Sequence, residues 1–142
     1  MNNNQTGKCQ CGKVSYSLNK DKVISAHHCH CKDCQKITGS GKATIVFIPT
    51  KSLKITNNYK VYSVIGHDGT NVHRGFCPNC GSPVISYVTE QPDLRFIKAG
   101  SLDDSSWINI ESSFWGISAN KWDPVNDNIC LLYTSPSPRD NL

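Results

Sequence analysis

Seven closely spaced cysteines constrain this chain more than any other feature of its sequence. They lie in the motifs KCQCGKV, HHCHCKDCQK and FCPNCGSP, as Cys9, Cys11, Cys29, Cys31, Cys34, Cys77 and Cys80. A chain of 142 residues can bury an ordinary core without several disulfides, and C-x-C and C-x-x-C spacings are typical of metal ligands. The sequence therefore predicts metal–thiolate sites that join segments far apart in the chain.

The length and the N-terminal segment favour a single compact domain in the cytoplasm. The opening MNNNQTGK contains no apolar run of the kind found in signal peptides, and no later segment approaches the ~18 apolar residues of a membrane span. In a reducing compartment, cysteines serve metal binding or catalysis more often than disulfides. We therefore expect a cytoplasmic protein with no membrane association.

The charge distribution argues against a nucleic-acid partner. The formal net charge is +4, but the basic residues are spread along the chain without a tract of five or six. Seven thiolates around two zinc ions would lower the net charge to about +1. We expect no nucleic-acid binding on grounds of charge.

Short runs rich in β-branched and aromatic residues predict strands. They are KVSYSL, KATIVFIP, SLKIT, YKVYSVI, VHRGF, PVISYV and LRFIKAG. Clusters of Gly, Asn, Asp and Pro separate these runs, and the one helical pattern is CKDCQKIT, which Gly39 ends. The predicted fold is mostly β: a single compact domain of short antiparallel sheets stapled by two zinc–thiolate sites.

Both ends of the chain differ in character from its middle. We expect residues 1–6 to be disordered, residues 7–129 to form the zinc-binding domain, and residues 130–142 to be a non-native or disordered tail. The segment CLLYTSPSPRD resembles the conceptual translation of a sequencing-library adaptor, in which case the natural C-terminus is missing. The alternative is a genuine Pro/Ser-rich terminus, and either interpretation excludes Cys130 from the chemistry.

Two of the motifs predict a closed, four-thiolate metal site. An extended C-x-C points both sulfurs to one side, and the C-x-x-C before Gly81 closes a tight loop around the same ion. Cys9, Cys11, Cys77 and Cys80 would then form a tetrahedron. The alternatives are unmetallated core cysteines or a redox dithiol, but CPNCGSPVISYV lacks the strand-to-helix junction typical of such dithiols.

The remaining three cysteines predict a second site that lacks one protein ligand. In an extended HHCHC, side-chain alternation places His27, Cys29 and Cys31 on one face and His28 and His30 on the other. The candidates for a fourth ligand are His27, a distant residue, water or a substrate atom. Three protein ligands and one exchangeable position are typical of catalytic zinc.

In their order and approximate spacing, the motifs GKCQCGKVSYS, CHCKDCQKITGSG, RGFCPNCGSPV and AGSLDD resemble the glutathione-dependent formaldehyde-activating enzyme family, which includes centromere protein V-like proteins. The resemblance covers roughly residues 7–123. It implies a mostly β fold with two zinc ions, a structural one at the four-cysteine set and a catalytic one at Cys29, Cys31 and Cys34.

The resemblance also implies a reaction in which glutathione and formaldehyde form S-hydroxymethylglutathione. Zinc held by three soft thiolates accepts another sulfur readily, so a small-molecule thiol could complete the site and attack the aldehyde. Zinc with three thiolates carries a net charge of −1, and a bound substrate thiolate would make it −2, which requires a nearby cation. The sequence does not select among Lys32, Lys36, Lys42 and Arg74.

Three functional hypotheses follow from the motifs. The first is a zinc-dependent carbon–sulfur lyase or synthase acting on glutathione and formaldehyde. The second is a non-catalytic zinc-stabilised module that binds glutathione or a macromolecular partner. In the third, His27 closes the second site, which then has only a structural role. The sequence leaves the oligomeric state open.

Overall fold

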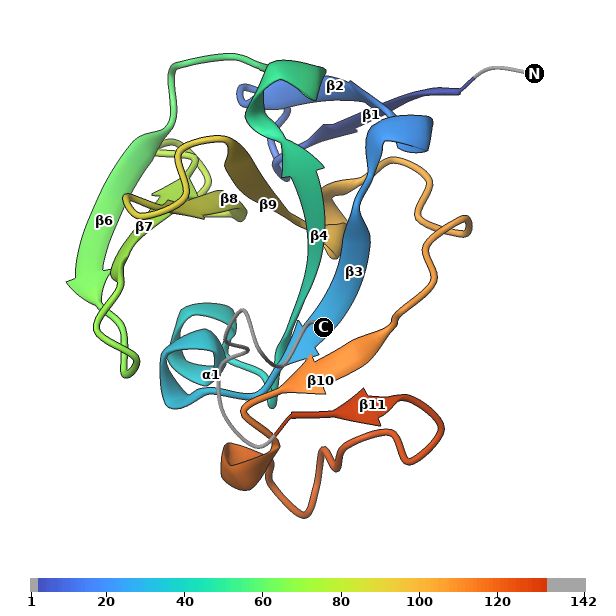
Figure 1. Cartoon of the computed structure of the whole chain (residues 1–142). Coiled ribbons are helices and arrows are strands. Elements are labelled where there is room, and N and C mark those ends of the chain that lie inside the picture. Colours follow the sequence, from blue (N-terminus) through green and yellow to red (C-terminus); the bar gives the residue numbers. More distant parts are fainter. Residues whose placement is uncertain (1–2, 133–142) are drawn as a thin grey trace. The chain divides into compact units, whose positions relative to one another are not determined.

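The computed structural model describes residues 3–132, and most of its regular structure is β-strand (Figure 1). Its residue contacts gather into two compact units, each built from two separate stretches of chain. The first unit comprises Met1–Ile24 and Val46–Ile108, and the second comprises Ser25–Ile45 and Asn109–Leu142. The predicted mostly β class is confirmed.

A three-stranded antiparallel sheet forms one part of the first unit. Its order is β1 (Asn4–Lys8), β2 (Ser15–Asn19) and β5 (Leu53–Ile55). In β2, the alternate residues Tyr16 and Leu18 are buried and their neighbours are less so, as expected for a strand with one face on the core. The alternation of SYSLN therefore sets which side of this sheet is covered.

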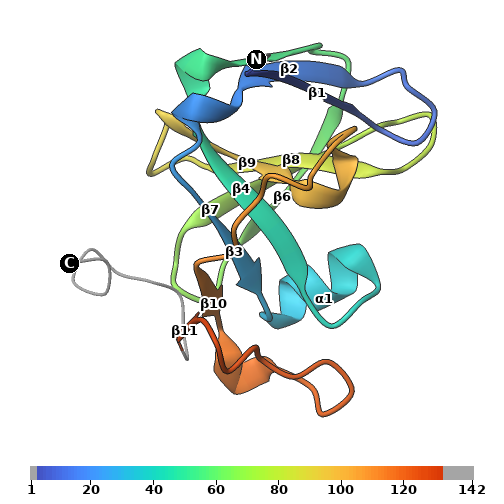
Figure 2. The ribbon, with the colours of Figure 1, turned by 90° about the vertical axis from the view of Figure 1, so that its right-hand side faces the viewer.

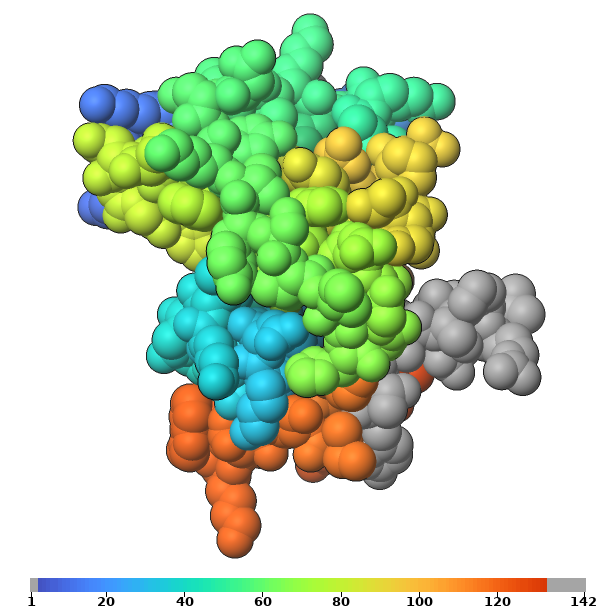
Figure 3. All heavy atoms as spheres, turned by 90° about the vertical axis from the view of Figure 1, so that its left-hand side faces the viewer, coloured from blue at the N-terminus to red at the C-terminus, as the bar shows by residue number. Residues whose placement is uncertain are grey.

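Four further strands of the first unit pair antiparallel in the order β9-β8-β7-β6. They are β6 (Lys60–Ile65), β7 (Asn71–Phe76), β8 (Pro83–Val88) and β9 (Leu94–Lys98). Figure 3 shows β6, in light green, lying open on one face of the molecule. Its Tyr62 and Ile65 side chains are 61% and 73% exposed. The core lies instead among the inner strands, where Val84, Ile85 and Ile97 are buried.

Within the described residues, the second unit combines one α-helix with strands that are neighbours in the order β11-β10-β3-β4. Its elements are β3 (Ser25–Cys29), α1 (Lys32–Thr38), β10 (Ser112–Phe114) and β11 (Cys130–Leu131), while β4 (Ala43–Pro49) contributes residues to both units. Figure 2 shows α1 in the chain between β3 and β4. Short 3-10 turns occupy Lys20–Lys22, Thr50–Ser52 and Ala99–Ser101 in the first unit and Gly116–Ser118 in the second.

The predicted antiparallel pairing is found in the first unit, but in the second unit β10 pairs parallel with both β3 and β11. Parallel neighbours need a long crossover instead of a tight turn. Here β3 and β10 are far apart in the sequence, with Ser112 opposite His27 and Phe114 opposite Cys29. Local sequence patterns do not reveal a pairing of this kind.

The short helix is confirmed and its ends explain its length. Cys31 is the N-cap, and its side chain accepts a hydrogen bond from the backbone N–H of Cys34. Gly39 is the C-cap with φ of 70°, a left-handed conformation that glycine adopts without a Cβ penalty, and its N–H donates to Gln35. The helix therefore stops after about two turns.

Residues 4–6 and 130–131 belong to strands, although the sequence predicts disorder for them. The disordered segment predicted for residues 1–6 is wrong for residues 4–6, because β1 starts at Asn4 and pairs with β2 over its whole length. At the other end, Cys130 and Leu131 pair with β10. Residues 133–142 of the predicted tail lie outside the described residues, so the origin of the tail stays a prediction.

None of the helices in residues 3–132 is long and apolar enough to cross a bilayer.

Candidate metal-thiolate sites

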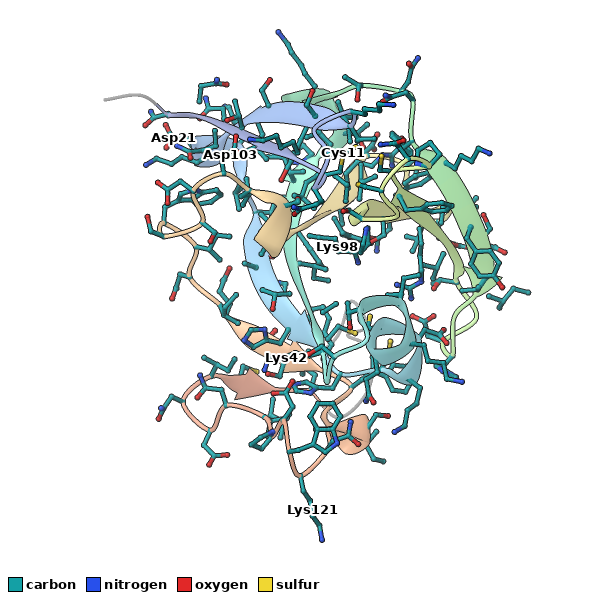
Figure 4. The ribbon with its side chains drawn as sticks, turned by 180° about the vertical axis from the view of Figure 1, so that it is seen from behind. Cys11, Asp21, Lys42, Lys98, Asp103 and Lys121 are labelled. Carbon is teal, nitrogen blue, oxygen red and sulfur yellow. The ribbon has the colours of Figure 1, made fainter. Side chains whose placement is uncertain are left out.

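Four cysteine sulfurs of the first unit meet at two adjoining turns; we refer to Cys9, Cys11, Cys77 and Cys80 as the first cluster. All four sulfurs lie within 4.8 Å of one another. Cys9 and Cys11 come from the turn that joins β1 to β2, and Cys77 and Cys80 from the turn that joins β7 to β8. Figure 4 shows one group of sulfur atoms beside Cys11 and another beside α1.

The two turns of the first cluster have the same backbone feature at their ends. Each ends in a glycine with positive φ, at 84° for Gly12 and 79° for Gly81. The Gly12 N–H donates to the Cys9 carbonyl at 3.1 Å, and the Gly81 N–H donates to the Cys77 carbonyl at 2.8 Å. The prediction that C-x-C lies in an extended segment is wrong, because Cys11 sits in this turn. A tight turn also directs both sulfurs to one side.

The spacing of the sulfurs fits a tetrahedral metal ion. The Cys9 and Cys11 sulfurs are 3.6 Å apart, and the Cys11 and Cys77 sulfurs are 3.7 Å apart. Zinc–sulfur bonds of about 2.3 Å give tetrahedral edges of about 3.8 Å. Backbone N–H groups of Val14 and Asn79 point at the Cys9 and Cys77 sulfurs, at 3.3 and 3.4 Å. Such donors stabilise thiolates, so these residues fit a closed zinc site.

Cys80 illustrates how the surroundings favour the thiolate form. Its sulfur lies 3.2 Å from the Ser82 hydroxyl. Hydrogen bonding from that hydroxyl, and then from backbone N–H groups, lowers the pKa of Cys80 to about 5. No helix follows Cys80, since β8 begins at Pro83. This arrangement lacks the strand-to-helix junction of a redox dithiol and favours metal binding.

The second cluster, Cys29, Cys31 and Cys34, forms around the start of α1. Cys29 ends β3, Cys31 caps the helix, and Cys34 lies in its first turn. The three sulfurs lie within 4.8 Å of one another, and all three residues are buried. The Cys34 N–H donates to the Cys31 sulfur at 3.3 Å. The end of a strand and a helix cap therefore bring the three thiols together.

Three buried thiols this close cannot all ionise without a cation among them. Hydrogen bonding with Cys31 and then Cys34, followed by burial, raises the pKa of Cys29 above its ordinary value. A bound metal ion would instead favour ionisation of the three thiols, because its positive charge stabilises thiolates. The composition of the second cluster is thus suited to a soft divalent cation such as zinc.

His27 is already engaged and does not complete the second cluster. Its Nδ1 lies 2.6 Å from the Ser112 hydroxyl, and its Nε2 lies 2.7 Å from the Ser25 hydroxyl. The ring stacks on Phe114 with centroids 4.5 Å apart. Burial lowers the pKa of His27 to about 4, so the ring is neutral near pH 7. Among residues 3–132, no fourth ligand atom joins the three sulfurs.

The two other histidines of the motif also lie outside the sulfur group. His28 faces Thr44, with its Nδ1 at 2.8 Å from the threonine hydroxyl. His30 is fully buried, and neither of its ring nitrogens has a hydrogen-bond partner within the described residues. Burial lowers the pKa of both rings. This arrangement agrees with the prediction that His28 and His30 do not join the cysteine ligands.

Gln35 holds the backbone around the second cluster, a role that the sequence did not indicate. Its Nε2 donates to the carbonyls of His30 at 2.8 Å and Ser118 at 2.9 Å, and its Oε1 accepts from Asn120 at 2.9 Å. His30 lies between two of the cysteines, so this amide fixes the chain that carries them. Nothing in the sequence around this glutamine indicates such a role.

We expect Gln35→Ala to weaken the metal affinity of the second cluster by about tenfold, because groups that orient ligands typically contribute 10- to 100-fold. The first cluster should keep its ion. Competition with a chromophoric chelator would measure both affinities, and the exposed neighbour Lys36 provides a matched control as Lys36→Ala. Equal affinities in Gln35→Ala and the control would contradict this role.

The four candidate cations differ in their exposure and in their partners. Lys32 and Lys36 are exposed on α1, as expected for solvated side chains. Lys42 forms an ion pair with Asp123 at 2.5 Å. Arg74, in contrast, is buried on β7 in the first unit.

Comparisons with known proteins agree with the cysteine pattern. The sequence profile described as "Glutathione-dependent formaldehyde-activating enzyme" matches residues 4–118. A search of curated proteins found no match. Among solved structures, a protein of Rhodobacter sphaeroides is similar, with a TM-score of 0.54 and 19% sequence identity over 73% of this chain and 90% of the other. That likeness concerns the fold alone.

Proposed function

Because this chain belongs to the glutathione-dependent formaldehyde-activating enzyme family, we propose that it is a zinc-dependent carbon–sulfur lyase or synthase that interconverts S-hydroxymethylglutathione with glutathione and formaldehyde. Glutathione-dependent formaldehyde activation is the theme of the family. The particular reaction, the zinc ions and the residue roles are our proposal.

The observation that carries the proposal is the composition of the second cluster. Three buried sulfurs converge, and among the residues described no fourth ligand joins them. Both ring nitrogens of His27, the histidine that the sequence offered as a fourth ligand, are paired with serine hydroxyls. A site with three protein ligands leaves a place for an exchangeable one. We assign that place to the substrate sulfur.

The chemistry proposed for this site is the addition of a thiol to an aldehyde. A carbon–sulfur bond forms, the carbonyl π bond breaks, and the thiol proton ends on the new hydroxyl oxygen. Zinc bound there would supply a soft Lewis acid that favours the thiolate form of a thiol. Cys29, Cys31 and Cys34 would hold the ion, and their burial would limit competition from water.

The first cluster has a different proposed role. Its four sulfurs satisfy a tetrahedral ion and leave no place for a substrate. Cys9 and Cys77 pack with Val14 and Val84 in the core of the first unit. A zinc ion at this position would join two turns that are far apart in the sequence, which is a structural role. Two zinc ions per chain and a cytoplasmic location stay predictions.

Exchange spectroscopy by NMR tests the proposal, because glutathione and formaldehyde also combine without a catalyst. We expect the zinc-loaded chain to increase the rate of interconversion well above the buffer rate, with saturation in glutathione. The Cys34→Ala variant, checked for a retained first metal ion, should fall to the buffer rate. A zinc-loaded protein that binds glutathione but leaves the rate unchanged would instead support the non-catalytic binding module.

A further inference from the structure

Strand β6 of the first unit combines an outer position with exposed apolar side chains (Figure 3). Val61, Tyr62 and Ile65 are 40%, 61% and 73% exposed. They are half of the large apolar side chains that stand exposed within residues 3–132, and the others are Ile24, Ile117 and Trp122. Lys60 is the one charged residue of this strand. β6 therefore lacks most of the charges that usually protect an outer strand from pairing.

The outer edge of β6 has free backbone groups. β6 comes last in the pairing order β9-β8-β7-β6. The Gly66 N–H donates to the Thr70 carbonyl at 2.8 Å, where β6 and β7 meet their turn. Backbone bonds alternate along an antiparallel pair, so every second residue before Gly66 bonds to β7. The backbone groups of Val61, Ser63 and Ile65 therefore point away from β7, and no other described strand pairs with them.

The sequence of β6 is self-complementary about its serine. In VYSVI, two β-branched or aromatic residues stand on each side of Ser63. A second copy, antiparallel and related by a two-fold axis at Ser63, would place Val61 opposite Ile65 of the copy. It would also place Tyr62 opposite Val64 of the copy. Cross-strand pairs of β-branched and aromatic residues are favourable, so this strand suits pairing with itself.

The position of the axis follows from the backbone groups. Residues at equal distances from a two-fold axis face each other. With the axis at Ser63, all three outward-pointing residues meet outward-pointing residues of the copy within β6. An axis at Tyr62 or Val64 would leave one of the three facing a residue beyond the strand. Ser63 is therefore the position that uses the whole edge.

Charge also agrees with a second copy as the occupant. In this register Lys60 lies opposite Gly66 of the copy, so the two lysines lie at opposite ends of the paired strands and do not repel each other. Gly66 begins the turn at residues 66–69, whose one formally charged side chain is the exposed Asp68. Each lysine thus faces the end of the copy that carries the opposite charge.

We propose that the chain forms a two-fold dimer through antiparallel β6–β6 pairing, with Ser63 at the axis. Such a contact is closed, because each copy uses its one β6 edge and leaves none for a third copy. The expected assembly is therefore a dimer instead of a filament.

Sedimentation velocity of the zinc-loaded full chain over a wide range of concentrations tests the dimer. We expect a monomer–dimer equilibrium that Ile65→Lys weakens by at least ~10-fold, because the substitution changes both Val61–Ile65 pairs. The matched control is Ile117→Lys, since Ile117 is 69% exposed and lies outside β6. A wild type that stays monomeric at every concentration, or equal dimerisation of Ile65→Lys and the control, would overturn the proposal. Thermal midpoints verify that each variant is folded.

A pair of opposite charges tests the register. Val61→Lys and Ile65→Glu should each weaken the dimer when introduced alone. Combined in one chain, they place a lysine opposite a glutamate of the copy twice, so the double variant should dimerise more tightly than either single variant. A double variant that dimerises no better than the single ones would overturn the axis at Ser63.

Amide hydrogen exchange tests the backbone pairing directly. At high concentration the N–H groups of Val61, Ser63 and Ile65 should become protected, and dilution should remove this protection. The N–H groups of Tyr62 and Val64, which bond to β7, should stay protected at both concentrations. A dimer in which Val61, Ser63 and Ile65 exchange as fast as in the monomer would show that the copies meet elsewhere.

Discussion

The Cys77→Ser variant is expected to lose one metal ion and most of the stability of the first unit. Cys77 is fully buried in the first cluster and packs with the core of that unit. Structural zinc contributes about 10–16 kcal/mol of apparent binding energy in zinc-finger peptides, whereas whole domains are stable by only about 5–15 kcal/mol. We therefore expect the free energy of unfolding to fall by at least ~3 kcal/mol, measured by urea denaturation.

Serine nearly preserves the size of cysteine, so a packing defect contributes little to this effect. The matched control is Cys130→Ser, because Cys130 is exposed and belongs to neither cluster. It should change neither the metal content by mass spectrometry nor the denaturation midpoint. Two bound metal ions and an unchanged midpoint in Cys77→Ser would show that the first cluster is not a structural metal site.

If the proposed function holds, the Cys31→Ala variant should lose the second metal ion and reduce the interconversion rate by at least ~100-fold, while keeping the first ion and the fold. Cys31 has two roles here, as one of three convergent sulfurs and as the N-cap of α1. Loss of the cap alone costs about 1 kcal/mol. Metal content, urea unfolding and the interconversion rate together measure both roles.

Cys31→Ser separates the cap from the metal ligand. Serine is a favourable N-cap but a poor ligand for zinc at neutral pH. This variant should therefore be as inactive as Cys31→Ala and about 1 kcal/mol more stable. Wild-type activity in either variant would exclude the second cluster from catalysis.

The sequence predicted those features that depend on neighbouring residues. Runs such as KATIVFIP and PVISYV have the composition of strands and form β4 and β8. CKDCQKIT forms a helix because Cys31 caps its start and Gly39 ends it. The cysteine motifs also grouped the sulfurs correctly, since all four of the first cluster and all three of the second converge.

Features that depend on distant pairing were not predictable. The parallel alignment of β3 with β10 joins residues far apart, as in Ser112 opposite His27. The position of Arg74 opposite Ser86 depends on the register of β7 and β8, and a one-residue slip would turn Arg74 away from Ser86. Ser25 and Ser112, which occupy both nitrogens of His27, carry no mark in the sequence. Only the fold shows that His27 is not available as a fourth ligand.

The central claim is that the second cluster receives the sulfur of a thiol substrate. Its most direct test is the visible absorption of the cobalt-substituted full chain during titration with glutathione, compared with Cys31→Ala. We predict a new, saturable sulfur-to-cobalt charge-transfer band in the wild type and none in the variant. A wild-type spectrum that stays unchanged, with both cobalt ions tetrahedral before glutathione is added, would contradict the claim and indicate a closed structural site.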